Sequence, residues 1–220
     1  KDLANAMKAE ICLFEGTYCK YRTEAENGKA PNATRAAAFL EECVDACEAV
    51  MPKYSLGEDY QATYNSTDLS GNKEIIFYKP YANNLFYHSL VSYVCSSTQI
   101  NGMTKDAFDA YLFTDGKPLA LTTCDKSDVG EVVDGDYRID SLLKVRDGRL
   151  AKTIDPVIYY EGMGWTRAGA MDMTSSTGYG VCKYDNITLP IDNRVNNNKA
   201  YTQAPLFWLA VIYCNFAEAK

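Results

Sequence analysis

The hydrophobic residues of the first 26 positions follow a helical period. Large apolar side chains advance by steps of three or four residues, at Leu3, Met7, Ile11, Phe14, Tyr18 and Tyr21. Steps of this size place side chains on one face of a helix, so the pattern predicts a long helix over residues 3 to about 26. The polar stretch at its end contains Gly28 and Pro31, which together predict a turn.

A second helix is expected after this turn. Thr34 is its expected N-cap, because a hydroxyl at that position can accept a hydrogen bond from the first turn. The inner side of this helix is expected to carry Ala38, Phe39, Cys43, Ala46, Cys47 and Val50. Two antiparallel helices joined by a short turn form an αα-hairpin, the unit from which tetratricopeptide-type solenoids are stacked. A single hairpin cannot bury both of its faces, so it needs neighbours.

Residues 205–220 predict a third helix. Pro205 suits the first helical turn, where its missing N–H would have had no partner. The segment is apolar nearly all round, so we expect it to pack on several sides, against the helices at 3–26 and 34–51. It is too short, and too interrupted by Glu218, for a membrane span. The helix has no capping signal where the sequence ends, which leads us to expect that the natural polypeptide continues.

The long segment between these helices is expected to be rich in loops. It holds one short apolar run, residues 73–78, which predicts either a strand or a buried helical turn. We therefore predict part of one mainly α domain, a tetratricopeptide-like hairpin scaffold (an α-α superhelix) with a large loop-rich insertion. Residues 1–52 form the hairpin, residues 53–204 the loop-rich region and residues 205–220 the scaffold helix.

Composition excludes some classes of function. The formal net charge of −7 argues against a nucleic-acid partner, because phosphate binding needs a basic surface. With one histidine and no C-x-x-C pair, the sequence predicts no metal site, and it predicts no cofactor. Among the eight cysteines, the pairs Cys12/Cys19 and Cys43/Cys47 each lie on one helix face, which fits small packing residues better than disulfides.

Four segments together carry a family resemblance. They are Ala9–Tyr21, Glu74-Ile-Ile-Phe77 with the aromatic residues after it, Arg146-Asp-Gly-Arg-Leu150, and Thr177-Gly-Tyr179 with Lys183 and the ending Asn215-Phe-Ala-Glu-Ala219. In this order the chain resembles the SusD/RagB family of outer-membrane nutrient-binding lipoproteins, whose motifs include R-D-x-R-L and N-Y-A-E-A. Trp208 and Val211 stand where the family has Arg and Glu, so no buried ion pair is expected there.

The resemblance implies a fold and a function. It implies a helical scaffold of tetratricopeptide-like hairpins that bears a loop-rich, ligand-binding subdomain. It implies a non-enzymatic protein at the outer-membrane surface that binds an oligosaccharide, or in some members a peptide. It also implies a SusC-like TonB-dependent transporter as partner. The match corresponds to the middle and later part of a family member, so the lipid anchor is expected outside these residues.

Two stretches are candidate ligand-binding surfaces, because sugars stack on aromatic rings and pair with amide, Arg or His groups. Trp165 lies in a Gly-flanked loop with Arg167 two residues away, although Trp165 could equally pin that loop to the scaffold. The second stretch contains Tyr81, Asn84 and His88. His88 is expected to be a hydrogen-bonded structural residue rather than a catalytic base, since no nucleophile motif accompanies it.

Two other clusters of charged residues are expected to have structural roles and not to bind ligands. Arg146, Asp147 and Arg149 are expected to tie adjacent loops by charge-assisted hydrogen bonds. Residues 134–140 have spaced carboxylates but lack the EF-hand pattern, which favours a solvated turn over a calcium site.

Two alternatives from other classes stay open. Glu161 and Asp172 lie near Trp165, and a polysaccharide hydrolase needs two carboxyl groups that flank the bond, but nothing in the sequence marks this pair. A purely structural helical-repeat adaptor is the other alternative, which the aromatic-rich insertion disfavours.

Overall fold

The computed structural model describes most of the chain. The described residues are 1–95, 101–125, 132–133, 136–137, 143–154, 177 and 179–220. They divide into two compact units, each described by itself below. The first unit comprises residues 1–58, 68–79 and 204–220, and the second comprises residues 59–67 and 80–203.

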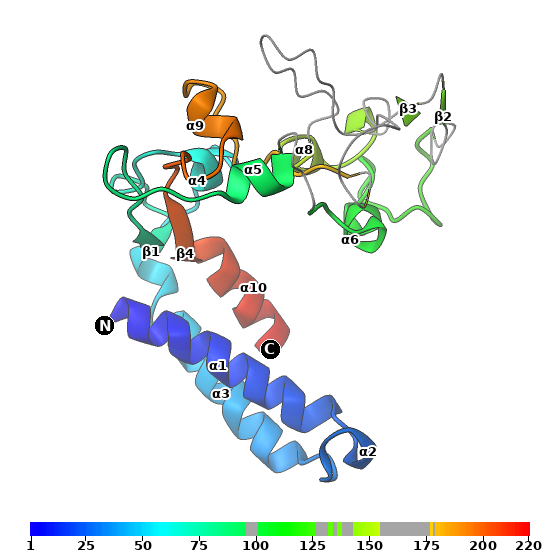
Figure 1. The fold of residues 1–220 in the computed structure, drawn as a ribbon. Helices are drawn as coiled ribbons and strands as arrows, with labels where there is room; N and C mark the ends of the chain where they lie inside the picture. Colours follow the sequence, from blue (N-terminus) through cyan, green and yellow to red (C-terminus); the bar gives the residue numbers. More distant parts are fainter. Residues whose placement is uncertain (96–100, 126–131, 134–135, 138–142, 155–176, 178) are drawn as a thin grey trace. The chain divides into compact units, whose positions relative to one another are not determined.

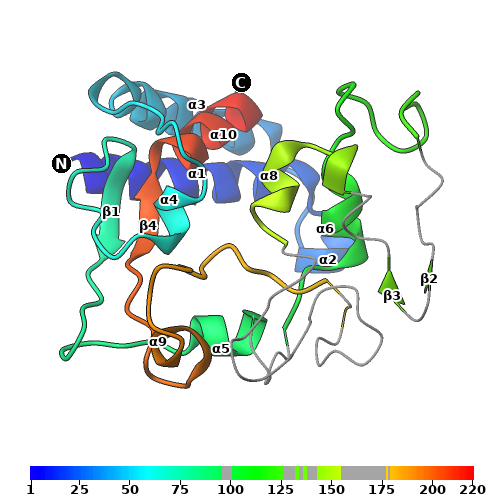
Figure 2. The ribbon, with the colours of Figure 1, turned by 90° about the horizontal axis from the view of Figure 1, so that it is seen from above.

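The first unit is a helical hairpin with a third helix beside it. Helix α1 (Asp2–Tyr21) leads through the short helix α2 (Glu24–Asn27) to helix α3 (Ala33–Glu48), which lies alongside α1 (Figure 1). Helix α10 (Leu209–Ala219) packs against both, as Figures 1 and 2 show. The predicted hairpin and its packing against the final helix are confirmed. A 3₁₀ turn (Met51–Lys53) follows α3.

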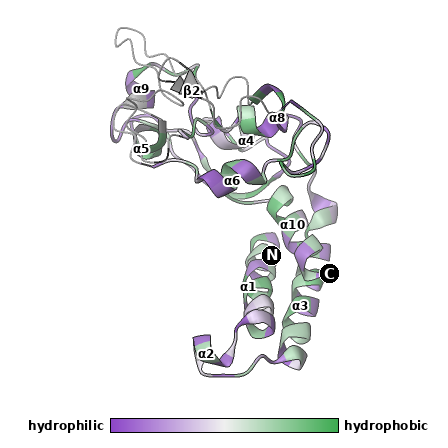
Figure 3. Cartoon of the chain, turned by 90° about the vertical axis from the view of Figure 1, so that its right-hand side faces the viewer, coloured by the Kyte–Doolittle hydropathy of each residue, from purple (hydrophilic) through white to green (hydrophobic). Residues whose placement is uncertain are grey.

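Small residues form the contact between α1 and α3. The buried residues of α1 are Ala6, Ala9, Cys12 and Gly16. The large apolar residues that predicted this helix are not among them, and five of them, Met7, Ile11, Phe14, Tyr18 and Tyr21, are exposed. The spacing of the large apolar residues therefore predicts the helix correctly, but these residues do not lie on the face that packs against α3. Figure 3 shows hydrophobic and hydrophilic residues mixed along both helices.

The start of α3 differs from the prediction. Asn32, not Thr34, is the N-cap: its backbone is extended and its Oδ1 accepts a hydrogen bond from the Arg35 N–H at 2.9 Å. Thr34 already lies inside the first turn of α3, one residue after its start, so it does not occupy the N-cap position. Of the residues expected on the inner side, Cys43, Ala46, Cys47 and Val50 are buried, Phe39 is half-buried and Ala38 is exposed.

The predicted helix over residues 205–220 begins too early. Its first part is strand β4 (Ala204–Trp208), which pairs antiparallel with strand β1 (Ile75–Lys79). Aromatic residues favour strands, and Pro205 is tolerated in this two-stranded ribbon because each strand has a free edge. The alternative reading of residues 73–78 as a strand is thus the correct one. Helix α10 begins at Leu209, whose N–H donates to the Glu74 carbonyl at 2.9 Å.

Helix α10 buries one side. Leu209, Ile212 and Asn215 are buried, and Ile212 joins the core formed by α1 and α3. Tyr213 and Cys214 are exposed, so the expectation of packing on several sides is wrong for the described residues. Apolar residues on every face of a helix therefore do not show how many of its faces are packed against other elements.

Three cysteines belong to the core of the first unit. Cys12, Cys43 and Cys47 are buried thiols and not disulfide partners, as their spacing predicted. Burial raises the pKa of the Cys47 thiol to about 12. The neutral thiol therefore packs here as a small apolar group.

The second unit is rich in loops, as predicted, and its regular elements are short. Its helices are α4 (Ala62–Asn65), α5 (Leu90–Cys95), α6 (Lys105–Ala110), α8 (Gly148–Ala151) and α9 (Asp192–Val195), and its strands are β2 (Val132–Val133) and β3 (Asp136–Tyr137). One small core is built around Val91, Val94, Cys182 and Ala200, and another around Phe108, Leu150 and Ile154. No helix among the described residues combines the length and apolar character needed to cross a membrane.

Candidate functional site

A tight loop over residues 81–88 is the candidate ligand-binding surface that the structure describes. Ala82 and Phe86 exchange two backbone hydrogen bonds, of 3.1 and 3.0 Å, which close the loop. Leu85 and Phe86 are strongly exposed at its tip. A closed turn that presents an aromatic ring to solvent is a preorganised surface, because little loop entropy is lost when a ligand binds.

The polar groups of this loop are held by Tyr87. Its hydroxyl accepts a hydrogen bond from the Asn84 N–H at 2.7 Å and donates to Asn83 Oδ1 at 2.6 Å. Asn84 has a positive φ of 63°, a conformation that asparagine tolerates better than most residues. The exposed residues Asn83 and Asn84 therefore belong to the same closed loop as Phe86 and are held by hydrogen bonds to Tyr87.

His88 anchors the loop to the segment at residues 200–202. Its backbone pairs with Ala200, and its Nε2 lies 3.0 Å from the Thr202 carbonyl oxygen. The Leu90 N–H donates to Nδ1 at 3.2 Å, so Nδ1 is the acceptor and Nε2 carries the proton. Both ring nitrogens have protein partners. This arrangement matches the expected structural role of His88.

The predicted site residues are brought together only in part. The rings of Tyr81 and His88 lie 4.7 Å apart edge to face, and Asn84 belongs to the same loop. Trp165 and Arg167 lie outside the described residues, as do Glu161 and Asp172. Most of the acidic segment at 134–140, which is expected to be a solvated turn, also lies outside them.

A second polar cluster was not predicted. The Lys183 Nζ lies 3.6 Å from the ring centre of Tyr64 and 4.9 Å from that of Tyr60, so its charge rests on two aromatic faces. Burial lowers the pKa of this ammonium below its ordinary value of 10.5. The tyrosines and the lysine are far apart in the sequence, and no local signal pairs them.

The Arg146-Asp-Gly-Arg-Leu150 segment is structural. The guanidinium of Arg146 is buried, lies 4.1 Å from the ring centre of Phe113 and donates from Nη1 to the Tyr111 carbonyl at 2.7 Å. Asp147 caps α8 and pairs with Arg149, and this pairing holds the pKa of the Asp147 carboxyl below its ordinary value. Arg146 thus ties two segments together, while Asp147 and Arg149 act within one turn.

The described residues contain no group of three or more His, Cys, Asp or Glu that could hold a metal ion. A strongly buried ion pair in the described part of this unit joins Arg194 Nη2 to Asp185 Oδ2 at 2.7 Å, with a second bond of 2.8 Å from Nε to Oδ1. Its bidentate geometry fixes α9 against the chain that follows Lys183.

Comparison with known proteins identifies the fold. No family model matches the sequence, and no curated protein sequence matches it. A SusD superfamily protein from Parabacteroides distasonis ATCC 8503 is similar in structure, with a TM-score of 0.54 and 14% identity. Another from Bacteroides fragilis NCTC 9343 has a TM-score of 0.49 and 16% identity over 100% of this chain and 40% of its own.

The similarity to the Parabacteroides protein covers 99% of this chain and 39% of that one. At this identity the likeness establishes the fold and not the ligand. It agrees with the motif resemblance in the sequence, which pointed to the same family. The mainly α fold of this chain, a helical hairpin scaffold with a loop-rich insertion, is similar to that of the Parabacteroides SusD superfamily protein.

Proposed function

We propose that the chain binds an oligosaccharide at the outer-membrane surface, for import through a SusC-like TonB-dependent transporter. The protein acts in this proposal as a binding protein and not as an enzyme. Its membrane anchor is a lipid attached outside these residues. The SusD fold and the motifs in the sequence support the assignment.

The observation that carries the choice of ligand is the rigid loop at residues 81–88. A pyranose ring has an apolar face that stacks on an aromatic ring, and its hydroxyls pair with amides. The loop offers both, because Phe86, Asn83 and Asn84 are all exposed in it. The predicted contribution of Trp165 and Arg167 remains part of the proposal.

The test is calorimetric titration of the chain with a panel of oligosaccharides and with a peptide pool. Asn84→Gly removes the amide but keeps a residue that tolerates positive φ, so it separates recognition from folding. We expect Asn84→Gly, Phe86→Ala and Trp165→Ala each to weaken oligosaccharide binding by about tenfold. Ile187→Ala is the matched control, because Ile187 is a large, exposed apolar residue of the same unit.

Three outcomes would contradict the proposal. Binding to peptides alone would keep the fold and change the ligand class. Unchanged affinity in Asn84→Gly and Phe86→Ala would move the site away from this loop. Release of shortened products from a labelled oligosaccharide would indicate a hydrolase.

A further inference from the structure

Helix α1 carries a second apolar face, which is exposed in the described part of the chain. Met7, Ile11, Phe14, Tyr18 and Tyr21 form this face, called the α1 stripe below, and Phe14 and Tyr21 are 65% and 66% exposed. The stripe runs over 15 residues, or about 21 Å of helix. It lies opposite the small residues that meet α3. Contiguous exposed apolar surface of this kind marks interaction sites in soluble proteins.

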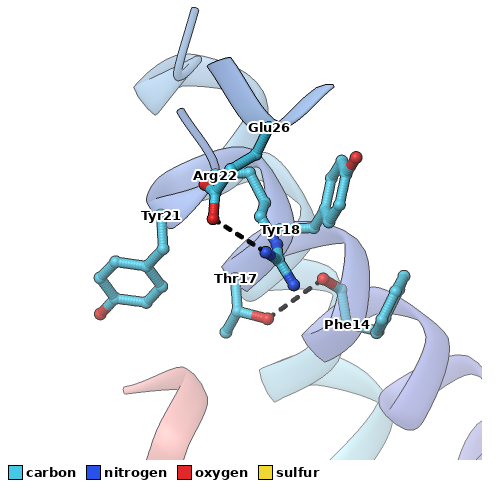
Figure 4. Close-up of a pocket in the computed structure, with 6 residues that line it drawn as sticks. All are labelled: Phe14, Thr17, Tyr18, Tyr21, Arg22 and Glu26. Carbon is cyan, nitrogen blue, oxygen red and sulfur yellow. Dashed lines mark hydrogen bonds and ion pairs between the residues drawn. The ribbon is translucent and has the colours of Figure 1, made fainter. Parts of the chain in front are cut away.

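Two hollows lie along the α1 stripe. The first is lined by Met7, Glu10, Ile11, Phe14, Glu15 and Phe207 and has a volume of about 320 Å³. The second is lined by Phe14, Thr17, Tyr18, Tyr21, Arg22 and Glu26 and has a volume of about 390 Å³. Figure 4 shows the second hollow, with the rings of Phe14 and Tyr18 on one side of Thr17 and the ring of Tyr21 on the other.

The spacing of the lining residues identifies the kind of partner. In each hollow four residues of α1 occupy positions i, i+3, i+4 and i+7, counted from Met7 in the first and from Phe14 in the second. Four residues at this spacing form the hole that receives one side chain of a facing helix. The two holes share Phe14 and are seven residues apart. They therefore match two apolar side chains of a partner helix that are also seven residues apart, about 10 Å along its axis.

The charges around the two holes differ. Glu10 and Glu15 border the first, and Glu10 has no ion-pair partner within the described part of the chain. The Glu15 carboxylate lies 3.9 Å from Arg35, a distant contact. At the second hole the charge is balanced, because Arg22 pairs with Glu26 at 3.1 Å. A complementary helix thus carries a basic side chain beside the apolar residue that enters the first hole.

We propose that the α1 stripe is the docking surface for an amphipathic helix of a partner protein, with apolar residues seven apart and Lys or Arg beside the first. A second copy of this chain fits less well. The formal net charge of −7 and the acidic border of the first hole would bring like charges together. The proposal does not depend on the ligand site, which lies in the other unit.

The test uses a synthetic helical peptide of about 18 residues, long enough to hold a helix when it is lactam-bridged. This lysine peptide has leucines at i, i+3, i+4 and i+7 and lysines beside them. A matched glutamate peptide keeps the leucines and has glutamate at each lysine position. Fluorescence anisotropy with the whole chain is expected to show saturable binding of the lysine peptide, with the glutamate peptide weaker by at least about tenfold.

Variants locate the binding. Phe14→Ala removes the wall that both holes share and is expected to weaken lysine-peptide binding by at least about tenfold. Leu121→Ala, at a 68% exposed position in the other unit, is the matched control and should bind like the wild type. Glu10→Lys should reverse the preference between the two peptides. Because Glu10 is exposed, Glu10→Lys should not disturb folding, and it can still test the proposal if Phe14→Ala folds poorly.

Three results would overturn the proposal. One is the absence of saturable binding of either peptide at concentrations up to about 1 mM. Another is equal affinity of the wild type and Phe14→Ala. The third is a dimer of the chain in sedimentation equilibrium that Phe14→Ala dissociates, since a second copy would then occupy the stripe.

Discussion

A Cβ atom at Gly16 of helix α1 would lie 2.7 Å from the Cδ2 atom of Leu40 on helix α3. Real Cβ atoms do not approach other heavy atoms so closely, and the Ala36 carbonyl oxygen is 3.3 Å from the same point. The two helices are therefore in contact at a position where only glycine fits without movement. This contact explains why small residues, and not the large apolar ones, line the interface.

Gly16→Val should destabilise the hairpin. The added methyl groups must displace Leu40 or separate the helices, and overpacking of this kind costs about 1–3 kcal/mol. Urea denaturation followed by circular dichroism measures the change in the free energy of unfolding.

Two further variants make this prediction specific. Gly148→Ala is the control, because a Cβ at Gly148 meets no atom within 4 Å, and it should be neutral or slightly stabilising. Leu40→Ala combined with Gly16→Val should recover part of the loss. A stability of Gly16→Val equal to that of the wild type would mean that the helices separate without cost.

The helical scaffold could be predicted from the sequence because the spacing of apolar residues within a short segment is enough to indicate a helix. The residues at 3 to 21 repeat every three or four positions, and this pattern needs no knowledge of distant residues. Which face is buried is a different question. Alanine, cysteine and glycine at positions 6, 9, 12 and 16 form the interface, and their small size gives a weak periodic signal.

The strand at residues 204–208 and the contacts of Lys183 could not be predicted, because both depend on segments that are distant in the sequence. Residues 205–208 form a strand only because Ile75–Lys79 lies beside them, and a short apolar run fits a strand or a helix equally well. The aromatic and amide residues of the loop at 81–88 predict a ligand-binding surface, and this stays a prediction. The cluster of Lys183 with Tyr60 and Tyr64 left no local trace in the sequence.

The buried pair Arg194–Asp185 should be important for the stability of the second unit. Its side chains are only 13% and 4% exposed, so Arg194→Met leaves the Asp185 carboxylate buried without its bidentate partner. Loss of one member of such a pair costs about 3–5 kcal/mol. Urea denaturation monitored by tyrosine fluorescence measures this loss.

An exposed pair provides the comparison for this prediction. Lys152 lies 3.9 Å from Asp59 with both side chains largely exposed, and Lys152→Met should change the free energy of unfolding by less than about 1 kcal/mol. The double variant Arg194→Met with Asp185→Leu should be more stable than Arg194→Met alone. Similar losses in Arg194→Met and Lys152→Met would show that burial does not set the strength of the pair.

Asp115 should make the loop that it closes sensitive to acid. Its carboxylate accepts hydrogen bonds from the Thr123 N–H at 2.9 Å and the Thr122 hydroxyl at 3.0 Å. These bonds, with that of the Thr123 N–H the largest cause, lower the pKa of Asp115 below its ordinary 3.8. Because the folded-state pKa is the lower one, the stabilisation is complete above the ordinary value. It is lost as the pH falls below 3.8 and through the folded-state pKa.

Hydrogen exchange measures this acid response directly. The protection factor of the Thr123 amide should fall below about pH 4 in the wild type and should be low at every pH in Asp115→Ala. The Cys182 amide, which donates to the Thr153 carbonyl at 2.8 Å, is the internal control. Equal protection of Thr123 in the wild type and in Asp115→Ala would show that the carboxylate does not hold the loop.

Tyr87→Phe should loosen the candidate binding loop while it keeps the aromatic ring. The lost hydroxyl leaves the Asn84 N–H and Asn83 Oδ1 without the bonds of 2.7 and 2.6 Å that fix them, at a cost of about 1 kcal/mol. The Asn84 amide resonance should shift and exchange faster in NMR spectra. Tyr213→Phe is the control, since Tyr213 is an exposed residue whose hydroxyl makes no hydrogen bond with the described residues.

The same variant separates preorganisation from direct contact. If the loop binds ligand as a rigid surface, Tyr87→Phe should weaken oligosaccharide affinity although Phe86 and both asparagines remain, because the loop must then be ordered on binding. The loss should be smaller than that in Phe86→Ala, which removes the stacking ring itself. An affinity equal to that of the wild type, together with a mobile Asn84 amide, would show that the hydroxyl orders the loop without contributing to recognition.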